Sequence, residues 1–368
     1  MLREEHRTKP YAFQALTLKP EIPETPMHGR HIPKPRSGHR IVNYRGNIFS
    51  FGGYNPSVAD DDEDMKDDPH WATSKPLFKE LWCYNPSTRR WKKLSMTAPV
   101  PDQLASHTAV AYEDKMLVYG GTGSPFGQSI SNTVFVLDFA VRTWSELDTA
   151  AERGLADMPR PLYGQAVALH DDKLYVVGGT SGYTYFMDVH VLDLTHRRWQ
   201  CLYKPSEQEQ VNGPTARYRH EICYYEGRIY VLGGGSSFEV QPLETLPAFD
   251  LETGTWNSVR THPDASIPIE ESYVEQYPRP RRCHSIEKCG HSKDHASAVV
   301  FKPFNLKCIT HNFISDVYLF GGFDGDKICS LIWRLDLSSM TWKCWPLVMP
   351  KPVYFHSSTI TEVTVHNL

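Results

Sequence analysis

The sequence lacks the patterns that mark several large classes of protein. No run approaches the roughly 18 apolar residues that a membrane helix needs, and the first ten residues, MLREEHRTKP, contain no apolar signal-peptide core. The eight cysteines are scattered without a CxxC pair, so the cysteine pattern does not indicate a disulfide framework. We therefore expect a soluble intracellular protein with reduced thiols, located in the cytoplasm, with the nucleus also open.

Excess charge and catalytic motifs are missing as well. The 39 Lys and Arg residues nearly balance the 43 Asp and Glu residues, which excludes the basic footprint of a nucleic-acid binder. There is no G-x-S-x-G elbow, and no Ser-His-Asp or Cys-His set can be tied together. The glycine-rich stretch 120–129 is not followed by GK[ST], so its glycines are expected to form turns. We expect no enzyme activity and no cofactor.

What the sequence does contain is repetition. A landmark His or Gln precedes a Gly-Gly doublet by thirteen residues at His39, His107, Gln165 and His220. A second spacing places Asp or Asn six residues before Trp, at Asn85/Trp91, Asp138/Trp144, Asp193/Trp199, Asp250/Trp256 and Asp336/Trp342. Two independent spacings with a period of about 50 residues indicate a solenoid or a propeller.

Short runs rich in β-branched and aromatic residues lie between the landmarks, for example 115–119, 173–177 and 228–232. Runs of this length bounded by Gly, Asp, Asn and Pro indicate strands, four in each repeat. One four-stranded sheet per repeat predicts an all-β fold, a kelch-type β-propeller. The plan is six-bladed with five complete blades and an incomplete sixth, at about 33–95, 101–149, 158–203, 214–260, 278–346 and 350–368.

Each landmark has a structural explanation in such a blade. The Gly doublet suits a crowded strand end where φ turns positive. Asp or Asn begins the turn between strands three and four, because its side chain hydrogen-bonds backbone groups two residues on. The Trp buries apolar surface between neighbouring blades. The landmark His residues are too regular to be catalytic, and we expect them mostly to form hydrogen bonds between strands.

Two segments depart from the repeat near the N-terminus. In the arm 1–32, the stretch 11–18 (YAFQALTL) could supply a strand that closes the ring. The loop 57–75 of blade one contains the acidic run DDDEDMKDD at 60–68, which lacks the Gly and Glu positions of an EF-hand. We expect this run to be solvated and disordered, although a basic partner could dock there.

Blade five carries a 24-residue excess, placed at 286–314, and a genuine loop or an error in the gene model would both explain it. It holds possible zinc ligands, but their spacing matches no common zinc module, so we expect no metal site; they are Cys289, His291, His295, Cys308 and His311, with Cys283 and His284 just upstream. The sixth repeat begins at 353–356, and its Gly doublet would fall at 369. Unless another strand intervenes, we expect a gap or loose seam between blades one and five.

The segment before the first strand of each blade should reach one mouth of the central channel. Blades one and two contribute mostly small residues there, whereas the later blades contribute arginines and aromatics. The expected carboxylate-binding residues are Arg217, Arg219, Arg281 and Arg282, and the expected peptide-lining residues are Arg36, Tyr163, Tyr218, Tyr354 and Phe355. Guanidinium groups gathered in this way suit a carboxylate or phosphate, and aromatic rims favour a peptide.

A structural role competes with this interpretation. An Arg at the start of the first strand often bonds carbonyl groups of a neighbouring blade, so any single Arg could be structural. Arg219 and Arg282 lie outside that usual position. These two residues favour a ligand.

Several strings resemble the kelch domain-containing protein 10 group: RSGHR (36–40), FGGYNP (51–56), PLFKELW (76–82), GGTGSPFG (120–127), LYGQA (162–166), RYRHE (217–221), RRCHS (281–285) and MPKPVYFH (349–356). The resemblance spans roughly residues 30–358 apart from the insert. It implies a substrate receptor of a cullin-2 ubiquitin ligase that binds C-terminal degrons, tails ending in Gly or Ala. It also implies that arginines clamp the terminal carboxylate, a role carried over to the four mouth arginines, while Tyr163, Tyr218 and Tyr354 wall the tail.

The resemblance further implies elongin B/C and cullin-2 as partners. In that group they bind a helical box after the sixth blade, which is absent here, so we expect this chain to bind tails without recruiting the ligase. The alternative hypothesis is a kelch scaffold that binds actin or a phosphatase, acts in stress signalling and does not recognise degrons.

Overall fold

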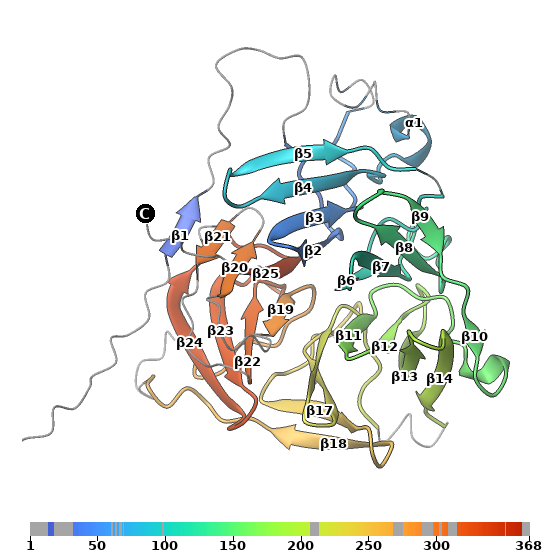
Figure 1. Cartoon of the computed structure of the whole chain (residues 1–368). Helices are drawn as coiled ribbons and strands as arrows, with labels where there is room; N and C mark the ends of the chain where they lie inside the picture. Colours follow the sequence, from blue (N-terminus) through green and yellow to red (C-terminus); the bar gives the residue numbers. More distant parts are fainter. Residues whose placement is uncertain are drawn as a thin grey trace, which may run out of the picture.

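The computed structural model describes residues 14–17, 32–59, 62, 65, 68, 70–97, 99–206, 213–267, 275–288, 297–301, 304–307, 315–349 and 351–362. These residues form six β-sheets around a central axis, with one short α-helix at the periphery (Figure 1). The predicted all-β kelch propeller is confirmed, and the first five sheets come from the five consecutive repeats. No helix in the described part of the chain is long and apolar enough to cross a membrane.

Each of the five repeat blades runs from its innermost to its outermost strand in chain order. Blade one comprises β2 (Arg40–Tyr44), β3 (Asn47–Phe51), β4 (Leu81–Asn85) and β5 (Arg90–Leu94), and blade two comprises β6 (Thr108–Tyr112), β7 (Lys115–Tyr119), β8 (Val134–Asp138) and β9 (Trp144–Glu146). Blade three contains β11 (Ala166–His170), β12 (Lys173–Thr180), β13 (Tyr185–Asp193) and β14 (Arg198–Tyr203), extended by the short parallel strand β10 (Ala150–Ala151). A 3-10 turn, η1 (Leu155–Asp157), lies between β10 and β11 in the chain.

Blades four and five follow the same order. Blade four comprises β15 (Glu221–Tyr225), β16 (Arg228–Leu232), β17 (Thr245–Asp250) and β18 (Thr255–Arg260). Blade five comprises β19 (Ser285–Lys288), β22 (Asp316–Phe320), β23 (Leu331–Asp336) and β24 (Thr341–Val348). The break in numbering after β19 marks the insert.

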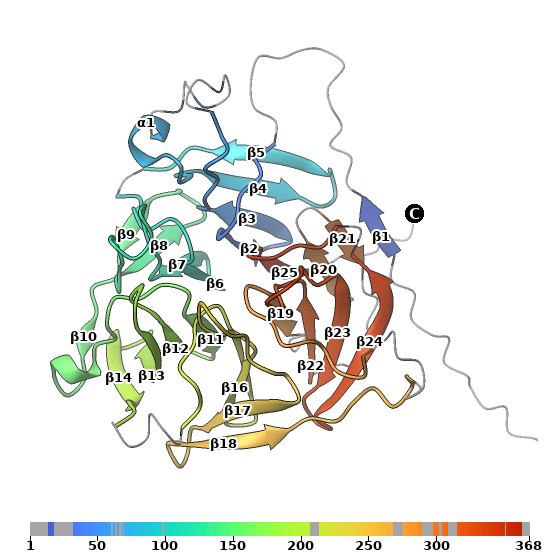
Figure 2. The same ribbon diagram turned by 180° about the vertical axis from the view of Figure 1, so that it is seen from behind.

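The sixth sheet is assembled from three distant parts of the chain. Its innermost strand is β25 (Ser358–Glu362), from the sixth repeat, and β25 pairs with β20 (Ser297–Phe301) of the insert. The insert also supplies β21 (Phe304–Lys307), which pairs with β1 (Gln14–Thr17) of the N-terminal arm. The sheet lies between blades five and one in both views (Figures 1 and 2), with β25 against β2 and β19.

The gap expected between blades one and five is therefore filled. The sixth repeat contributes one strand, and the remaining positions are taken by strands of the insert and the arm. The seam was expected unless another strand intervened, and the insert supplies such strands, because β20 and β21 join the neighbouring sheet instead of forming a loop of blade five. The expectation of no metal site in the insert is not tested, because the possible zinc ligands lie outside the described residues: Cys289, His291, His295, Cys308 and His311.

The Asp and Trp landmarks take the predicted roles. Asp138 Oδ1 accepts the amide of Ala140 at 2.8 Å, and Asp250 and Asp336 make the same bond two residues on. Trp144 is buried against Phe51 of the preceding blade, with ring centroids 4.7 Å apart. Trp199 likewise packs on Tyr119, at 5.4 Å. These rings join consecutive blades through apolar burial.

The Gly doublets join blades through the main chain. The second Gly donates its N–H to a carbonyl of the following blade at each of five joints: Gly53 to Leu104, Gly121 to Leu162, Gly179 to Arg217, Gly234 to Arg281 and Gly322 to Val353. The first Gly has positive φ throughout, and a Cβ on Gly52 would lie 2.5 Å from the Leu104 carbonyl oxygen. Only glycine allows such close approach at this φ.

The landmark polar residues pack beside these joints. His220 Nε2 lies 3.1 Å from the Val177 carbonyl oxygen of blade three, and Gln165 Nε2 donates to the Tyr119 carbonyl of blade two, also at 3.1 Å. Burial lowers the pKa of His107, His220 and His356 to about 3. These imidazoles are neutral wedges packed between blades. His220 and His356 make hydrogen bonds across a joint, the latter with Ser285 Oγ at 2.8 Å, whereas the ring nitrogens of His107 are buried without a hydrogen-bond partner among the described residues.

Candidate functional site

A ring of six main-chain hydrogen bonds encircles the propeller axis. Each blade contributes the residue just before its landmark, namely Gly38, Ser106, Gly164, Arg219, Cys283 and Phe355. Each N–H donates to the carbonyl of the preceding member at 2.7–3.0 Å, and Gly38 N–H closes the ring on the Phe355 carbonyl at 2.8 Å. All six residues have φ between 54° and 67°. This backbone conformation turns every carbonyl toward its neighbour in the ring.

The ring divides the channel into two parts. The space within the ring is a cavity of 20 Å³, bordered by the side chains of Arg219 and Phe355, which is room for about one water molecule. Beyond the ring lies a separate cavity of 270 Å³ between the innermost strands, which Arg40 and Glu221 span with an ion pair of 3.0 Å. The channel is therefore closed at the Gly-doublet side. We use the word bowl for the residues around this closed end, with the ring as its floor.

Three of the five arginines that the sequence placed at the mouth have the same buried hydrogen-bonding arrangement: Arg36, Arg217 and Arg281. In Arg217 and Arg281, Nε donates to a carbonyl two residues back, and Nη1 donates to the first Gly carbonyl of the same blade, Gly233 and Gly321 respectively. Arg36 repeats both bonds with Lys34 and Gly52. The expectation of four guanidinium groups converging on the mouth is corrected to two, because Arg217 and Arg281 are only 3% and 2% exposed.

Burial also lowers the pKa of two of these residues. Desolvation lowers the pKa of Arg217 to about 10, and it lowers the pKa of Arg281 as well. Both residues are structural, but they bond carbonyls of their own blade and not, as the sequence had suggested, those of a neighbouring blade.

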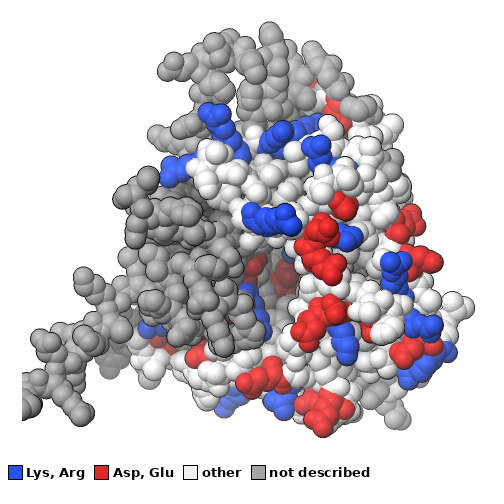
Figure 3. All heavy atoms as spheres, in the orientation of Figure 1, with Lys and Arg blue, Asp and Glu red and all other residues white. Residues whose placement is uncertain are grey.

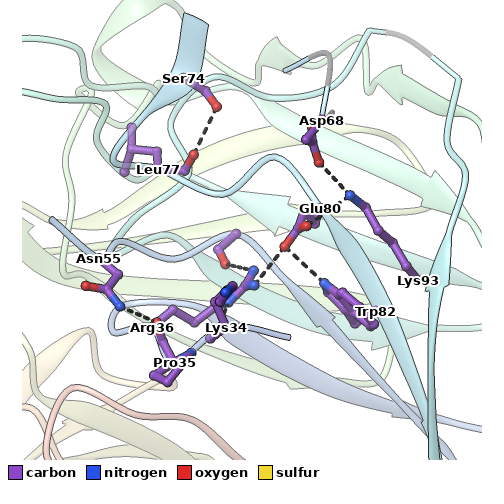
Figure 4. Close-up of polar contacts among 11 residues, drawn as sticks. Lys34, Pro35, Arg36, Asn55, Asp68, Ser74, Leu77, Glu80, Trp82 and Lys93 are labelled. Atoms are coloured by element: carbon purple, nitrogen blue, oxygen red, sulfur yellow. Dashed lines mark hydrogen bonds and ion pairs between the residues drawn. The ribbon is translucent and has the colours of Figure 1, made fainter. Parts of the chain in front are cut away.

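Arg36 belongs to a buried charge network in blade one (Figure 4). Its Nη2 donates to Glu80 Oε2 at 2.7 Å, and Trp82 Nε1 donates to the same oxygen at 3.0 Å. Lys93 bridges Glu80 and Asp68, which ties the acidic segment to the blade. Arg36 is therefore part of the blade interior, and the structure does not place it among the peptide-lining residues.

The acidic segment is packed at the residues that the structure describes. Met65 and Trp71 are buried against Phe78, and α1 (Trp71–Ser74) follows them. The expectation of a solvated run is wrong for Asp68, which is buried and bound by Lys93. Apolar residues flanking the acids supply the anchor that charge counting alone does not reveal.

Arg219 lies at the floor of the bowl. Its guanidinium stacks on Phe355 at 4.0 Å and on Tyr218 at 4.9 Å. Nη1 donates only to the Cys283 thiol, at 3.4 Å, and Nε is buried without a hydrogen-bond partner. No acidic side chain in the described part of the chain pairs with Arg219. It is a cation held by aromatic faces, with donors that remain available to an anion.

Arg282 occupies the wall of the bowl. Its Nη1 donates to the Ser236 carbonyl in the loop between β16 and β17, and its guanidinium lies 5.8 Å from the Phe323 ring. Within the described ranges it has no acidic partner either. The two surplus arginines of the sequence are thus the ones that keep unpaired charge at the mouth.

The predicted aromatic residues lie around the same end of the channel. Tyr163 packs edge-on against Tyr218, with centroids 6.5 Å apart, and Tyr354 faces Phe323 at 6.2 Å. Phe355 covers Gly38, where a Cβ would lie 2.7 Å from the Phe355 ring. The small residues of the early blades therefore make room for the large residues of the later ones.

Other chemistry finds little support in this arrangement. Among the described residues, no group of three or more His, Cys, Asp or Glu side chains could hold a metal ion. On the face shown in Figure 3, Lys and Arg are interspersed with Asp and Glu, so the visible surface carries no continuous basic patch. At this mouth, Arg219 and Arg282 are flanked by aromatic rings and have no acidic partner among the described residues.

Two parts of the site were not predicted from the sequence. The hydrogen-bonded ring is made of main-chain groups, and its only sequence signal is the position before each landmark. The residue type there is not constant: two repeats have Gly, at Gly38 and Gly164, and the other four have Ser, Arg, Cys and Phe. The loop tips of blades three and four, Tyr183 and Phe238, are 95% and 98% exposed on the same face. Their signal was an aromatic residue inside a short Gly/Ser loop.

The fold and the site define a kelch-repeat propeller with a binding bowl at one mouth. A family model described as the KLHDC2/KLHL20/DRC7 Kelch-repeats domain matches residues 4–210 and 70–288. Kelch domain-containing protein 10 of Xenopus tropicalis is 37% identical over 333 residues, covering 90% of this chain and 70% of that protein. The human protein of the same name is 37% identical over 344 residues, covering 92% and 67%.

A Drosophila melanogaster protein named kelch domain-containing protein 10 homolog is 34% identical over 366 residues, covering 96% of this chain and 54% of its own length. The chain therefore belongs to the kelch domain-containing protein 10 family, which confirms the resemblance inferred from the sequence.

Proposed function

We propose that this chain is a non-catalytic receptor that binds the C-terminal tails of other proteins, ending in Gly or Ala, in the bowl around Arg219. In this proposal it selects substrates for a cullin-2 ubiquitin ligase, with elongin B/C as the adaptor, and the bound proteins are degraded. Arg219 and Arg282 bind the terminal carboxylate, while Tyr163, Tyr218, Tyr354 and Phe355 wall the tail.

The closed floor is the observation that carries the proposal. Because the ring and its side chains leave only 20 Å³ at the axis, a polypeptide that reaches Arg219 cannot continue through the channel. A chain end is the one part of a polypeptide that can approach such a floor head-on. A C-terminal end brings a carboxylate, the group that Arg219 lacks among the described residues.

The narrow floor also supports a small last residue. Arg219 contacts both Phe355 and Tyr218 there, so a bulky terminal side chain would have to displace these groups. Gly or Ala would leave the carboxylate free to approach the guanidinium. Arg217 and Arg281 support the bowl from the interior and have no contact role in the proposal.

The test is binding of a fluorescein-labelled ten-residue peptide that ends in Gly, compared with the same peptide amidated at its C-terminus. We expect the amide to bind at least about 30-fold more weakly, because charge-assisted hydrogen bonds to the carboxylate are lost. Equal affinity for the two peptides would contradict the proposal and would favour a kelch scaffold that uses other surfaces.

Substitutions locate the site. Arg219→Ala and Arg282→Ala should each weaken carboxylate binding about tenfold or more, whereas Arg198→Ala, at an exposed position of β14, should leave it unchanged. Circular dichroism of each variant checks the fold. If neither mouth arginine affects a carboxylate-dependent interaction, the carboxylate is bound elsewhere.

The ligase part of the proposal has its own measurement. Purified elongin B/C with cullin-2 is added to the tagged protein, and co-purification is measured with and without a bound tail peptide. Recruitment would support the receptor role. Tail binding without recruitment would limit the role of this chain to tail recognition.

A further inference from the structure

Two aromatic side chains stand fully exposed beside the bowl. Tyr183 is 95% exposed at the turn between β12 and β13, and Phe238 is 98% exposed at the turn between β16 and β17. Aromatic side chains that are almost fully exposed to water are unfavourable and commonly mark a contact surface. Both turns belong to the bowl face, since Tyr163 pairs with Thr180 and Tyr218 pairs with Gly235 at their bases.

The two turns have the same construction. Ser181 N–H lies 3.1 Å from the Thr184 carbonyl oxygen, and Ser236 N–H lies 2.9 Å from the Glu239 carbonyl oxygen. The aromatic residue takes the third position of the four-residue turn in both blades. In blade five the corresponding turn, Asp324 to Lys327, has Asp326 at that position. Aromatic tips are therefore a feature of two adjacent blades.

Both tips are held in place by side-chain contacts. Ser236 Oγ accepts the amides of Phe238 and Glu239, and Arg282 donates to the Ser236 carbonyl. Tyr185, next to the blade-three turn, holds the blade-four turn through a 2.6 Å hydrogen bond to Ser237 Oγ. The blade-three turn is fixed by Thr180 Oγ1, which donates to the Thr184 carbonyl at 2.9 Å. Rings presented on fixed turns lose little conformational entropy when a partner binds.

A continuous path of contacts connects these tips to the floor of the bowl. From Ser237 it runs to Tyr185, then to Tyr218 with ring centroids 5.2 Å apart, and then to Arg219 at 4.9 Å. A polypeptide whose terminus lies at Arg219 would leave the bowl along this aromatic wall, and Arg282 keeps the wall cationic near the terminus.

We propose that Tyr183 and Phe238 form an apolar clamp, which grips a hydrophobic side chain of the bound polypeptide a few residues before its C-terminus. This inference rests on the proposed tail-binding function and adds a second determinant to it. The receptor would then read a small terminal residue together with an upstream Phe, Leu or similar side chain. Tails with the right terminus but a polar upstream segment would bind weakly.

The experiment uses ten-residue labelled peptides of Ser and Gly that end in a free Gly carboxylate. One Phe is placed in turn at each of the second to seventh positions before the end, and a peptide without Phe is the reference. We expect about tenfold tighter binding when Phe occupies one or two adjacent positions. The gain should disappear in the double variant Tyr183→Ser/Phe238→Ser.

The variants are chosen so that folding does not obscure the outcome. Both positions are nearly fully exposed, so the substitutions remove little packing. Leu155→Ser is the matched control, because Leu155 is 90% exposed on η1, and it should retain the Phe gain. Binding that is indifferent to the position of Phe, or a gain that survives in the double variant, would overturn the clamp.

Amidated versions of the same peptides separate this inference from the proposed function. If amidation abolishes binding while the double variant matches the wild type, the clamp is wrong and tail recognition stands. If amidation changes nothing while the Phe gain still requires Tyr183 and Phe238, terminus recognition is wrong and the clamp is an apolar docking site in its own right.

Discussion

The glycines of the doublets are required for two separate reasons, the positive backbone φ and the lack of space for a Cβ atom. At Gly233, φ is 55°, and an added Cβ would lie 2.5 Å from the Arg281 carbonyl oxygen of the next blade. Gly254 of the same blade also has positive φ, at 68°, but nothing lies within 4 Å of its Cβ position. Substitutions at Gly254 and Gly233 can therefore separate the cost of backbone strain, which both positions share, from the cost of a steric clash, which only Gly233 would have.

We therefore predict that Gly254→Ala costs about 1–2 kcal/mol of unfolding free energy, from the left-handed backbone alone. Gly233→Ala should cost at least about 2 kcal/mol more, because the joint between blades four and five must open. Urea denaturation monitored by tryptophan fluorescence measures both. Equal costs would show that the joint tolerates the added methyl group.

The arginines show that the same residue type at similar repeat positions can have different surroundings. Arg217, Arg219 and Arg281 are the same residue type at nearly the same repeat position, yet only Arg219 is in the ring and free of main-chain carbonyls at its guanidinium. Sequence spacing identified the surplus pair Arg219 and Arg282. It could not show that the other two are held by the Gly carbonyls, because that depends on the depth of each side chain in the blade.

At the scale of elements, the acidic segment of blade one depends on one buried carboxylate. Glu80 accepts hydrogen bonds from Arg36 and Trp82 and pairs with Lys93, which in turn binds Asp68 (Figure 4). Removing one partner from a buried ion pair leaves an uncompensated charge, which costs about 3–5 kcal/mol.

Glu80→Gln should therefore destabilise the protein by about 3 kcal/mol and release the segment 57–75 to proteases before the rest of the chain unfolds. Asp102→Asn removes an ion pair whose carboxylate is 76% exposed, and it should cost no more than about 1 kcal/mol. Limited proteolysis followed by mass spectrometry, alongside denaturation, distinguishes the two variants. A segment that stays protected in Glu80→Gln would mean that Met65 and Trp71 anchor it without the charge network.

The elements that could be predicted are those whose residues recur. His39 and Gly52, or Asp138 and Trp144, fix a blade because the same side chains meet the same neighbours in each repeat. The strands β20 and β21 carry no such landmarks, so the sequence did not reveal that they complete a sheet with β25. β1, in contrast, lies within the stretch 11–18 that the sequence marked as a possible closing strand. Pairing between segments nearly 300 residues apart leaves no local signal.

At the scale of the whole molecule, the buried imidazoles make folding sensitive to acid. The pKa values of His107, His220 and His356 are lowered by burial to about 3, and that of His284 is also lowered well below its usual value. Since free histidine titrates near 6.5, the unfolded chain binds more protons than the folded chain between these values. Stability must then fall as pH falls from about 6.5 toward 3.

Each such histidine contributes a slope of about 1.4 kcal/mol per pH unit in that window, so the protein should unfold cooperatively near pH 4–5 given ordinary stability. Thermal unfolding midpoints measured from pH 8 to pH 4 check this. A midpoint that stays constant down to pH 4.5 would contradict the assignment of these residues as buried neutral wedges.

Blade three supplies a control for the same effect. Gln165 occupies the landmark position there and makes the equivalent interblade hydrogen bond without a titratable group. His220→Gln should keep the fold at pH 7.5 and reduce the loss of stability on acidification by about 1 kcal/mol per pH unit. An unchanged acid profile would assign the sensitivity to other groups.

The link between Phe355 and Gly38 has a consequence for biosynthesis. β2 is synthesised well before the sixth repeat, yet its Ile41 amide donates to Ser357 Oγ, 316 positions later in the chain. At roughly 5–20 residues per second, the first blade waits many seconds with one flank uncovered. We expect the nascent protein to need a chaperone during that interval, and to become resistant to misassembly only after the segment around Ser357 has been synthesised.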